Sequence, residues 1–158
     1  AKITKNMTSA QKQAFLDGLH EYFDFSTMAH AALFDEWDKR TVEEQARFTV
    51  AFTAMLQRNY LKKLYEHAGY TVEITGEKIK EDKAQVATRL SQSGKSAAPV
   101  DITYRLQKTK VGWRIYDVLT DEVSLVRNYR STFADILKNK GFAGLMEHLQ
   151  KQASGPLP

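Results

Sequence analysis

The sequence predicts one α+β domain, in which helices from both ends of the chain wrap an antiparallel sheet of four strands. Two changes of hydrophobic period support this prediction. Apolar residues recur with helical spacing as far as Gly69, alternate with a period of two from Tyr70 to about Leu119, and return to helical spacing at Ser124. The turns between the predicted strands are short and polar, and short turns join antiparallel neighbours.

The composition fits a single globular domain of 158 residues, which we place at residues 1–152 with a disordered tail at 153–158. Zero cysteines exclude disulfides and thiol chemistry. There is no apolar run long enough to span a bilayer, and no signal peptide is visible. The net charge of +4 is spread along the chain, which makes nucleic acid a weak expectation.

The first half of the chain predicts three helices. Thr8 with Gln11, and Thr41 with Glu44, have the spacing of capping boxes. Between them, Asp24 or Ser26 is expected to cap a short helix. The helix that begins after Thr41 is expected to run to about His67 and to end at Gly69. Its buried stripe is predicted to be Phe48, Phe52, Met55 or Leu56, Tyr60 and Leu64.

The second half predicts the strands and two more helices. The strands are expected at 71–79, 83–91, 100–107 and 112–119, separated by polar turns. A helix should then begin at Ser124, with Leu125, Tyr129 and Phe133 on its apolar stripe. Residues 138–141 should end it, and Phe142 should open a last short helix.

Asp117 is the acidic residue that needs an explanation. By simple alternation it shares a strand face with Trp113 and Ile115, and an unpaired carboxylate there is costly. We expect it to be paired, with Arg130 as the candidate partner or a nearby backbone group as the donor. The alternative is a catalytic base in a small pocket enzyme, for which Asp101 is the other candidate.

Other catalytic and metal motifs are weak. The four histidines lack metal-ligand spacing, the glycine that a P-loop requires before Gly94-Lys95-Ser96 is absent, and Ser9-Ala10-Gln11-Lys12 has no companion motif. We therefore expect no metal site, no catalytic residues and no cofactor.

The stretch WRIYDVLTDEVSLVRNYRSTF, residues 113–133, carries a family resemblance. It resembles the signature of the MlaC-like proteins, also called the toluene-tolerance family. Three further blocks match in order: residues 23–33, the segment that starts at Thr41, and GFAGLMEHL near the end. The family usually has glycine just before the Val-Ser-Leu step, where this chain has Glu122, and it tends to have a longer N-terminal helical region.

The resemblance implies a periplasmic phospholipid carrier, present as a mature chain after removal of a signal peptide. Its implied partners are phospholipid, an inner-membrane MCE-domain/ABC transporter complex and an outer-membrane lipoprotein–porin complex, and its implied role is to maintain outer-membrane lipid asymmetry.

The fold that the resemblance implies is a helix-and-sheet cradle. A curved sheet wrapped by helices is also the shape of the cone-like folds of the NTF2 type, with an apolar cavity. The alternatives that the residues leave open are an enzyme of the ketosteroid-isomerase-like cone-pocket type and an interaction module with a solid core.

For a carrier, the apolar stripes of helix, sheet and corner become candidate contacts of the lipid tails. The tail contacts that we predict are Phe52, Leu56, Tyr60 and Leu64 on the long helix, Val72, Ile74, Val86, Leu90, Ile102, Tyr104, Tyr116 and Val118 in the sheet, and Val123, Leu125, Tyr129 and Phe133 at the corner. A charged headgroup should stay at the surface, within reach of Arg127, Arg130, Lys62 or Lys63.

Overall fold

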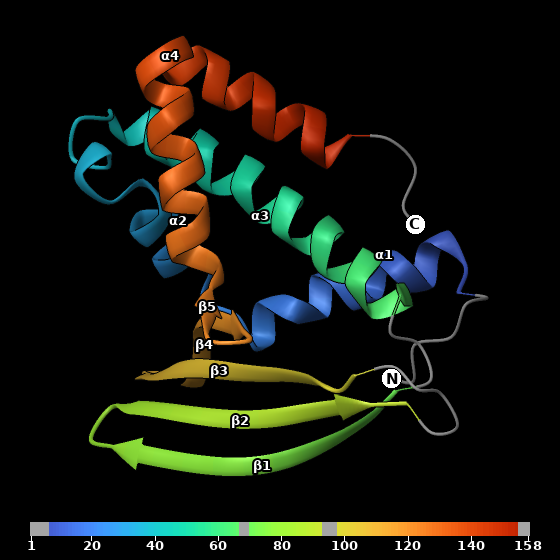
Figure 1. Ribbon diagram of the computed structural model, residues 1–158. Helices are drawn as coiled ribbons and strands as arrows, with labels where there is room; N and C mark the ends of the chain where they lie inside the picture. Colours follow the sequence, from blue (N-terminus) through green and yellow to red (C-terminus); the bar gives the residue numbers. More distant parts are fainter. Residues whose placement is uncertain (1–6, 67–69, 93–97, 155–158) are drawn as a thin grey trace.

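The computed structural model describes residues 7–66, 70–92 and 98–154. Its elements are, in chain order, α1 (Ser9–Gly18), the 3-10 helix η1 (Leu19–Glu21), α2 (Phe25–Leu33), the 3-10 helix η2 (Phe34–Glu36), α3 (Val42–Glu66), β1 (Thr71–Lys80), β2 (Lys83–Ser91), β3 (Val100–Thr109), β4 (Gly112–Thr120), β5 (Val123–Ser124) and α4 (Leu125–Ala153). The helices lie on one side of the sheet, with α3 running diagonally above it (Figure 1). The predicted α+β class and the antiparallel sheet are confirmed.

The helices begin where the sequence predicts. The backbone amide of Glu44 donates to Thr41 Oγ1 at 3.2 Å, and the amide of Thr41 donates to Glu44 Oε2 at 2.9 Å, which completes the capping box of α3. Thr8 and Gln11 form the same box at α1. Of the two candidate caps of α2, Asp24 is the one that accepts the helix amide, from Thr27. The predicted end of α3 at His67–Gly69 lies outside the described residues.

Within the described residues the sheet has five strands, in the order β1-β2-β3-β4-β5, rather than the predicted four. The additional strand is short. Val123 and Ser124 fold back and pair with Thr120 and Leu119 at the end of β4. Two residues are too few to show a period of two, so the sequence carries no signal for this strand. At the other end of β4, the backbone around Phe23 pairs with Ile115.

A bulge in β4 corrects the predicted placement of Asp117. The register runs from Arg105 opposite Asp117 to Leu106 opposite Ile115, so Tyr116 is an additional residue on β4. Because successive residues of β3 point to opposite faces, Asp117 and Ile115 also lie on opposite faces. The prediction that these two residues share a face is therefore wrong.

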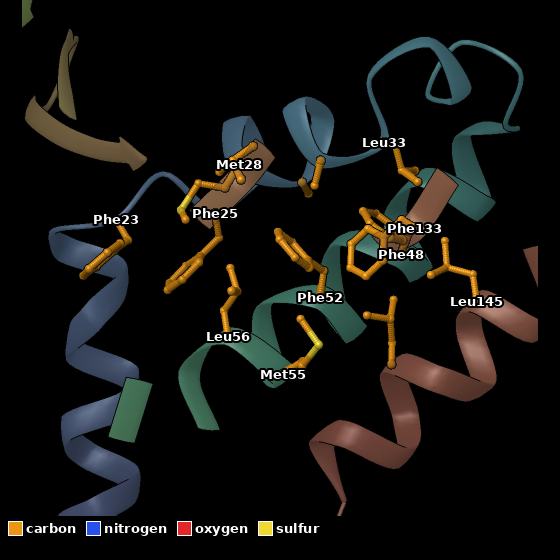
Figure 2. Packing of buried hydrophobic residues seen from close by; sticks show 14 of the residues in the cluster. Phe23, Phe25, Met28, Leu33, Phe48, Phe52, Met55, Leu56, Phe133 and Leu145 are labelled. Carbon is orange, nitrogen blue, oxygen red and sulfur yellow. The ribbon is translucent and has the colours of Figure 1, made fainter. Parts of the chain in front are cut away.

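The hydrophobic core is helical. Phe48, Phe52 and Phe133 are fully buried, and their rings meet edge to face or stacked at centroid distances of 5.5–5.7 Å. Figure 2 shows these rings between α2, α3 and α4, with Met55 and Leu145 beside them. From the sheet, Ile115 and Val118 pack against this cluster. The sheet thus contributes to the core mainly through β4.

The last helix is bent at Gly141, where the predicted break falls. Gly141 has φ 66° and ψ −172°, a conformation that is essentially restricted to glycine. Gly144 is needed for a different reason: a Cβ there would overlap the Cβ of Lys140. The bend folds the C-terminal arm of α4 back over α3, as Figure 1 shows in red.

Candidate functional site

One face of the sheet carries apolar side chains on each of its strands, with Glu77 and Lys108 as its charged members. We call it the inner face and define it as the face that carries Ile115 and Val118, because these two residues pack against the helical core. The register assigns the other members by pairing. The described apolar side chains of the inner face are Val72, Ile74, Ile79, Ala84, Val86, Leu90, Val100, Ile102, Tyr104, Leu106, Trp113 and Val123, together with Ile115 and Val118. Most of the predicted tail contacts of the sheet are therefore brought together on one surface.

The inner face becomes more exposed from β4 toward β1. Ala84 on β2 is buried, whereas Val72, Ile74 and Ile79 on β1 are 65%, 68% and 60% exposed. Every residue of β1 is exposed. Large aliphatic side chains in a row on one strand face are costly to leave in water, and such surfaces commonly mark a binding site. The outer half of the inner face is thus an apolar wall that the helices leave uncovered.

Two tyrosines stand where α3 approaches the sheet. Tyr60 of α3 lies beside Tyr104 of β3, and the ring of Phe23 meets Tyr60 edge to face at 5.6 Å. Burial, with the hydroxyl of Tyr104 next to it, raises the pKa of Tyr60 far above its ordinary value. Burial also raises the pKa of Tyr104. These hydroxyls put polar groups into an otherwise apolar space.

The predicted tail contacts on helices are placed differently from those on the sheet. Phe52 and Phe133 are fully buried in the aromatic cluster with Tyr129, whose hydroxyl accepts a hydrogen bond from Asn59 Nδ2 at 3.2 Å. Leu56 is buried, and Leu125 packs against the same cluster. The side chain of Leu64 lies outside the described residues. The described members of this group belong to the packed helical core, which lies next to the apolar wall.

Sequence reasoning counted Tyr116 among the tail contacts and left out several inner-face residues, among them Ile79, Val100 and Leu106. Tyr116 is the additional residue of the bulge, and the ammonium of Lys83 lies 4.9 Å from the centre of its ring. Ile79 reaches the inner face because a register shift between Ile74 and Gly76 changes the alternation of β1. A glycine inside a strand pattern was the available signal for that shift.

The four predicted headgroup cations do not form one cluster. Lys62 and Lys63 are exposed near the end of α3, whereas Arg127 and Arg130 lie in the first turns of α4, at the other end of the sheet (Figure 1). Arg130 Nε donates to the carbonyl of Ala31 at 3.0 Å, and its guanidinium lies 4.0 Å from the centre of the Phe34 ring. One phosphate can therefore contact only one of the two pairs.

Asp117 is paired, but its partner is not Arg130. Ser124 Oγ donates to Asp117 Oδ2 at 2.7 Å, and the backbone amides of Val126 and Val118 donate to Oδ1 at 3.2 and 2.9 Å. The cationic contact is Arg105 Nη1 at 3.5 Å. The predicted pairing of this buried carboxylate with a backbone donor is confirmed, and the choice of Arg130 is wrong because Arg130 caps α2 instead. The carboxylate accepts bonds that hold the β4–α4 corner.

Asp101, the other acid of the enzyme alternative, is exposed. It forms a two-pronged salt bridge in which Arg89 Nε lies 2.7 Å from Oδ1 and Nη2 lies 2.9 Å from Oδ2. These hydrogen bonds hold the pKa of Asp101 below its usual range. A carboxylate with a lowered pKa is a weak base, which is the opposite of what proton abstraction at neutral pH requires.

Among residues 7–66, 70–92 and 98–154, no group of three or more histidine, aspartate or glutamate side chains is placed to hold a metal ion. Over the same residues, no helix has both the length and the apolar character to cross a membrane.

Two open grooves flank α3 and share Val50 and Ala54. One, of about 580 Å³, lies against the C-terminal arm of α4 at Met146. The other, of about 710 Å³, is lined by Phe23 and Phe25 and by Val111 of the β3–β4 turn, among others. Neither groove is lined by the apolar wall of the inner face.

The sequence matches a known family model. The model of the MlaC protein matches residues 1–151, nearly the entire chain. The chain belongs to the MlaC family. This MlaC family member is 23% identical, over 120 residues, to the intermembrane phospholipid transport system binding protein MlaC of Haemophilus influenzae. The match covers 74% of this chain and 56% of the relative, so the chain spans little more than half of that relative's length.

A solved structure supports the same fold. The phospholipid-binding protein of Ralstonia solanacearum, determined in complex with a phospholipid, matches this MlaC family member with a TM-score of 0.74 and 23% identity. The match covers 90% of this chain and 84% of that one. At this identity the likeness establishes the shared architecture.

Proposed function

We propose that this MlaC family member is a periplasmic phospholipid carrier that holds acyl chains against the inner face of its sheet. The observation that carries the proposal is the row of exposed aliphatic side chains on β1, Val72, Ile74 and Ile79. This row continues inward to the buried Ala84 of β2 and the partly buried Ile115 and Val118 of β4. Transfer of an acyl chain from water to such a surface gains about 0.8 kcal/mol per CH₂ group. An apolar wall next to a packed helical core has the chemistry that lipid tails require.

The proposed partners follow from the family and from the names of the relatives. The carrier would receive and deliver phospholipid between an inner-membrane ABC transporter complex with an MCE-domain subunit and an outer-membrane lipoprotein–porin complex, and so maintain outer-membrane lipid asymmetry. No cofactor is part of this proposal, and the bound phospholipid is the ligand. The headgroup would remain at the surface, where the exposed Lys62 and Lys63 or the exposed Arg127 can contact its phosphate.

Two experiments test the proposal. One identifies the lipid that the purified chain carries, and the other introduces a single charge into the apolar wall. Mass spectrometry of an organic extract of the purified protein should identify phospholipid. Ile74→Lys places a charge in the wall at an exposed position and should strongly reduce the extracted lipid. Gln85→Lys is the matched control, because Gln85 is exposed on the opposite face of the neighbouring strand β2.

Ile74 is a cleaner target than Val118 or Leu125, because those two residues pack against the helical core and their replacement would disturb the fold. Circular dichroism should give the same unfolding transition for both lysine variants, since both positions are exposed. If the wild-type protein carries no lipid when purified from cells, or if Ile74→Lys and Gln85→Lys retain equal loads, the carrier proposal fails.

A further inference from the structure

Two hairpin turns lie side by side at one end of the sheet. The β1–β2 turn is formed by Glu81 and Asp82, and the β3–β4 turn by Lys110 and Val111. The amide of Lys108 donates to the carbonyl of Asp82 at 2.8 Å, and Lys83 Nζ donates to Gln107 Oε1 at 3.0 Å. These contacts tie the two turns into one surface, which we call the basic hairpin end and define as residues 77–83 and 108–114.

The basic hairpin end carries an excess of positive charge. Its cationic side chains are Lys78, Lys80, Lys83, Lys108, Lys110 and Arg114, and its acidic ones are Glu77, Glu81 and Asp82. All three acids lie in residues 77–83, so every charged residue of the segment 108–114 is basic. Lys108 and Lys110 are exposed. Since the whole chain has a net charge of +4, this end concentrates most of that excess.

An apolar side chain stands at the tip of this charged surface. Val111 is 74% exposed although it is aliphatic. Two hydrogen bonds hold the turn that presents it: Thr109 Oγ1 donates to the carbonyl of Gly112 at 2.7 Å and accepts from the amide of Val111 at 3.3 Å. Gly112 has φ 111°, which favours glycine there. A fixed turn thus holds an aliphatic side chain in water next to Lys110.

We propose that the basic hairpin end docks on the surface of an anionic lipid bilayer. Lysines near such a surface are attracted to acidic headgroups, and an apolar side chain among them can enter the boundary between headgroups and acyl chains. An exposed aliphatic side chain beside Lys110 fits a surface that has acidic headgroups outside and acyl chains beneath them. The inference does not require that the protein carries a lipid, since Lys108, Lys110 and Val111, which carry it, are not residues of the apolar wall.

The test is vesicle flotation at low and high salt. Wild-type protein should float with vesicles of phosphatidylcholine containing phosphatidylglycerol, release them as salt rises, and ignore pure phosphatidylcholine. Lys108→Glu with Lys110→Glu should weaken binding by at least about 25-fold, since each lysine near the surface contributes about fivefold. Lys138→Glu with Lys140→Glu on α4 is the matched control, with the same spacing, exposure and charge change.

Val111→Ser separates insertion from simple attraction of charge. It should weaken binding to the anionic vesicles severalfold and leave the salt dependence unchanged, because it removes apolar contact alone. Equal weakening by the two double variants would overturn the proposal, because it would trace binding to total charge. Failure of the wild-type protein to bind anionic vesicles would also overturn it and leave an acidic protein surface as the partner of this end.

Discussion

Ser124 Oγ lies 2.7 Å from Asp117 Oδ2, so the residue that caps α4 is itself held by a carboxylate from β4. The same hydroxyl oxygen accepts a hydrogen bond from the amide of Arg127 at 3.2 Å, as an N-cap should. Asp117 also accepts from the amide of Val126 at 3.2 Å. Strand, corner and helix are therefore joined by one buried carboxylate, and this geometry explains its burial without a catalytic role.

The first prediction is that Asp117→Asn destabilises the fold. The amide presents an NH₂ group to donors that require an oxygen, and a buried donor without an acceptor is costly. We expect a loss of about 2 kcal/mol in the free energy of unfolding, measured by urea denaturation. The amount of phospholipid extracted from the folded variant should stay close to that of the wild type.

Asp101→Asn is the control for this change. Asp101 is exposed and its salt bridge to Arg89 lies in water, so the substitution should change the unfolding midpoint little. Equal midpoints for Asp117→Asn and the wild type would show that the carboxylate does not hold the corner.

The second prediction is that Glu122→Gly stabilises the protein. Glu122 has φ 69°, in the left-handed region where a side chain is strained, and the turn residue before it, Asp121, has φ 47°. Glycine, which the MlaC-like pattern usually has at this step, removes the strain. We expect a gain of about 1 kcal/mol in the free energy of unfolding. An unchanged or lower thermal midpoint would contradict this reading of the corner.

The starts and breaks of the helices were predictable because each signal is contained in a few neighbouring residues. Thr41 with Glu44, Ser124 and Gly141 start or break helices through their own backbone and side-chain chemistry. The bulge at Tyr116 was not predictable, because it is defined by the register with β3 and not by β4 alone. A single additional residue there reversed the predicted orientation of Asp117.

The residues of the candidate site were likewise predictable only in part. The sheet members, such as Val72 and Ile74, were predictable from alternation because one face of each strand is apolar. On α3, by contrast, an aromatic stripe looks the same whether it packs a core or lines a cavity. Phe52 is fully buried because Tyr129 and Phe133 of α4 pack on its ring, and no short stretch of sequence encodes contacts between residues so far apart.

The third prediction concerns that bend. Gly141→Ala forces a side chain into a conformation with φ 66° and ψ −172°, and should lower the free energy of unfolding by about 2 kcal/mol. Gly18→Ala is the matched control, because Gly18 has φ −63° and nothing lies within 4 Å of an added Cβ. That change should leave stability unchanged or raise it by up to about 1 kcal/mol. Equal losses in the two variants would argue against a strained bend.

The last prediction is a loss of stability in alkali that depends on Tyr60. Below about pH 10 its hydroxyl is neutral in both the folded and the unfolded protein, so it adds no pH dependence. Above that pH the unfolded chain loses the proton, whereas burial beside Tyr104 raises the pKa of Tyr60 and keeps the folded hydroxyl neutral. Proton release thus favours unfolding, and stability falls as the pH rises, by up to about 1.4 kcal/mol per pH unit for one such group.

Urea denaturation between pH 9 and 11 should show a shallower decline of the free energy of unfolding for Tyr60→Phe than for the wild type. Tyr22→Phe, which removes an exposed tyrosine, is the control and should keep the wild-type slope. If the slopes of all three proteins coincide, the hydroxyl of Tyr60 is not sealed between α3 and the sheet.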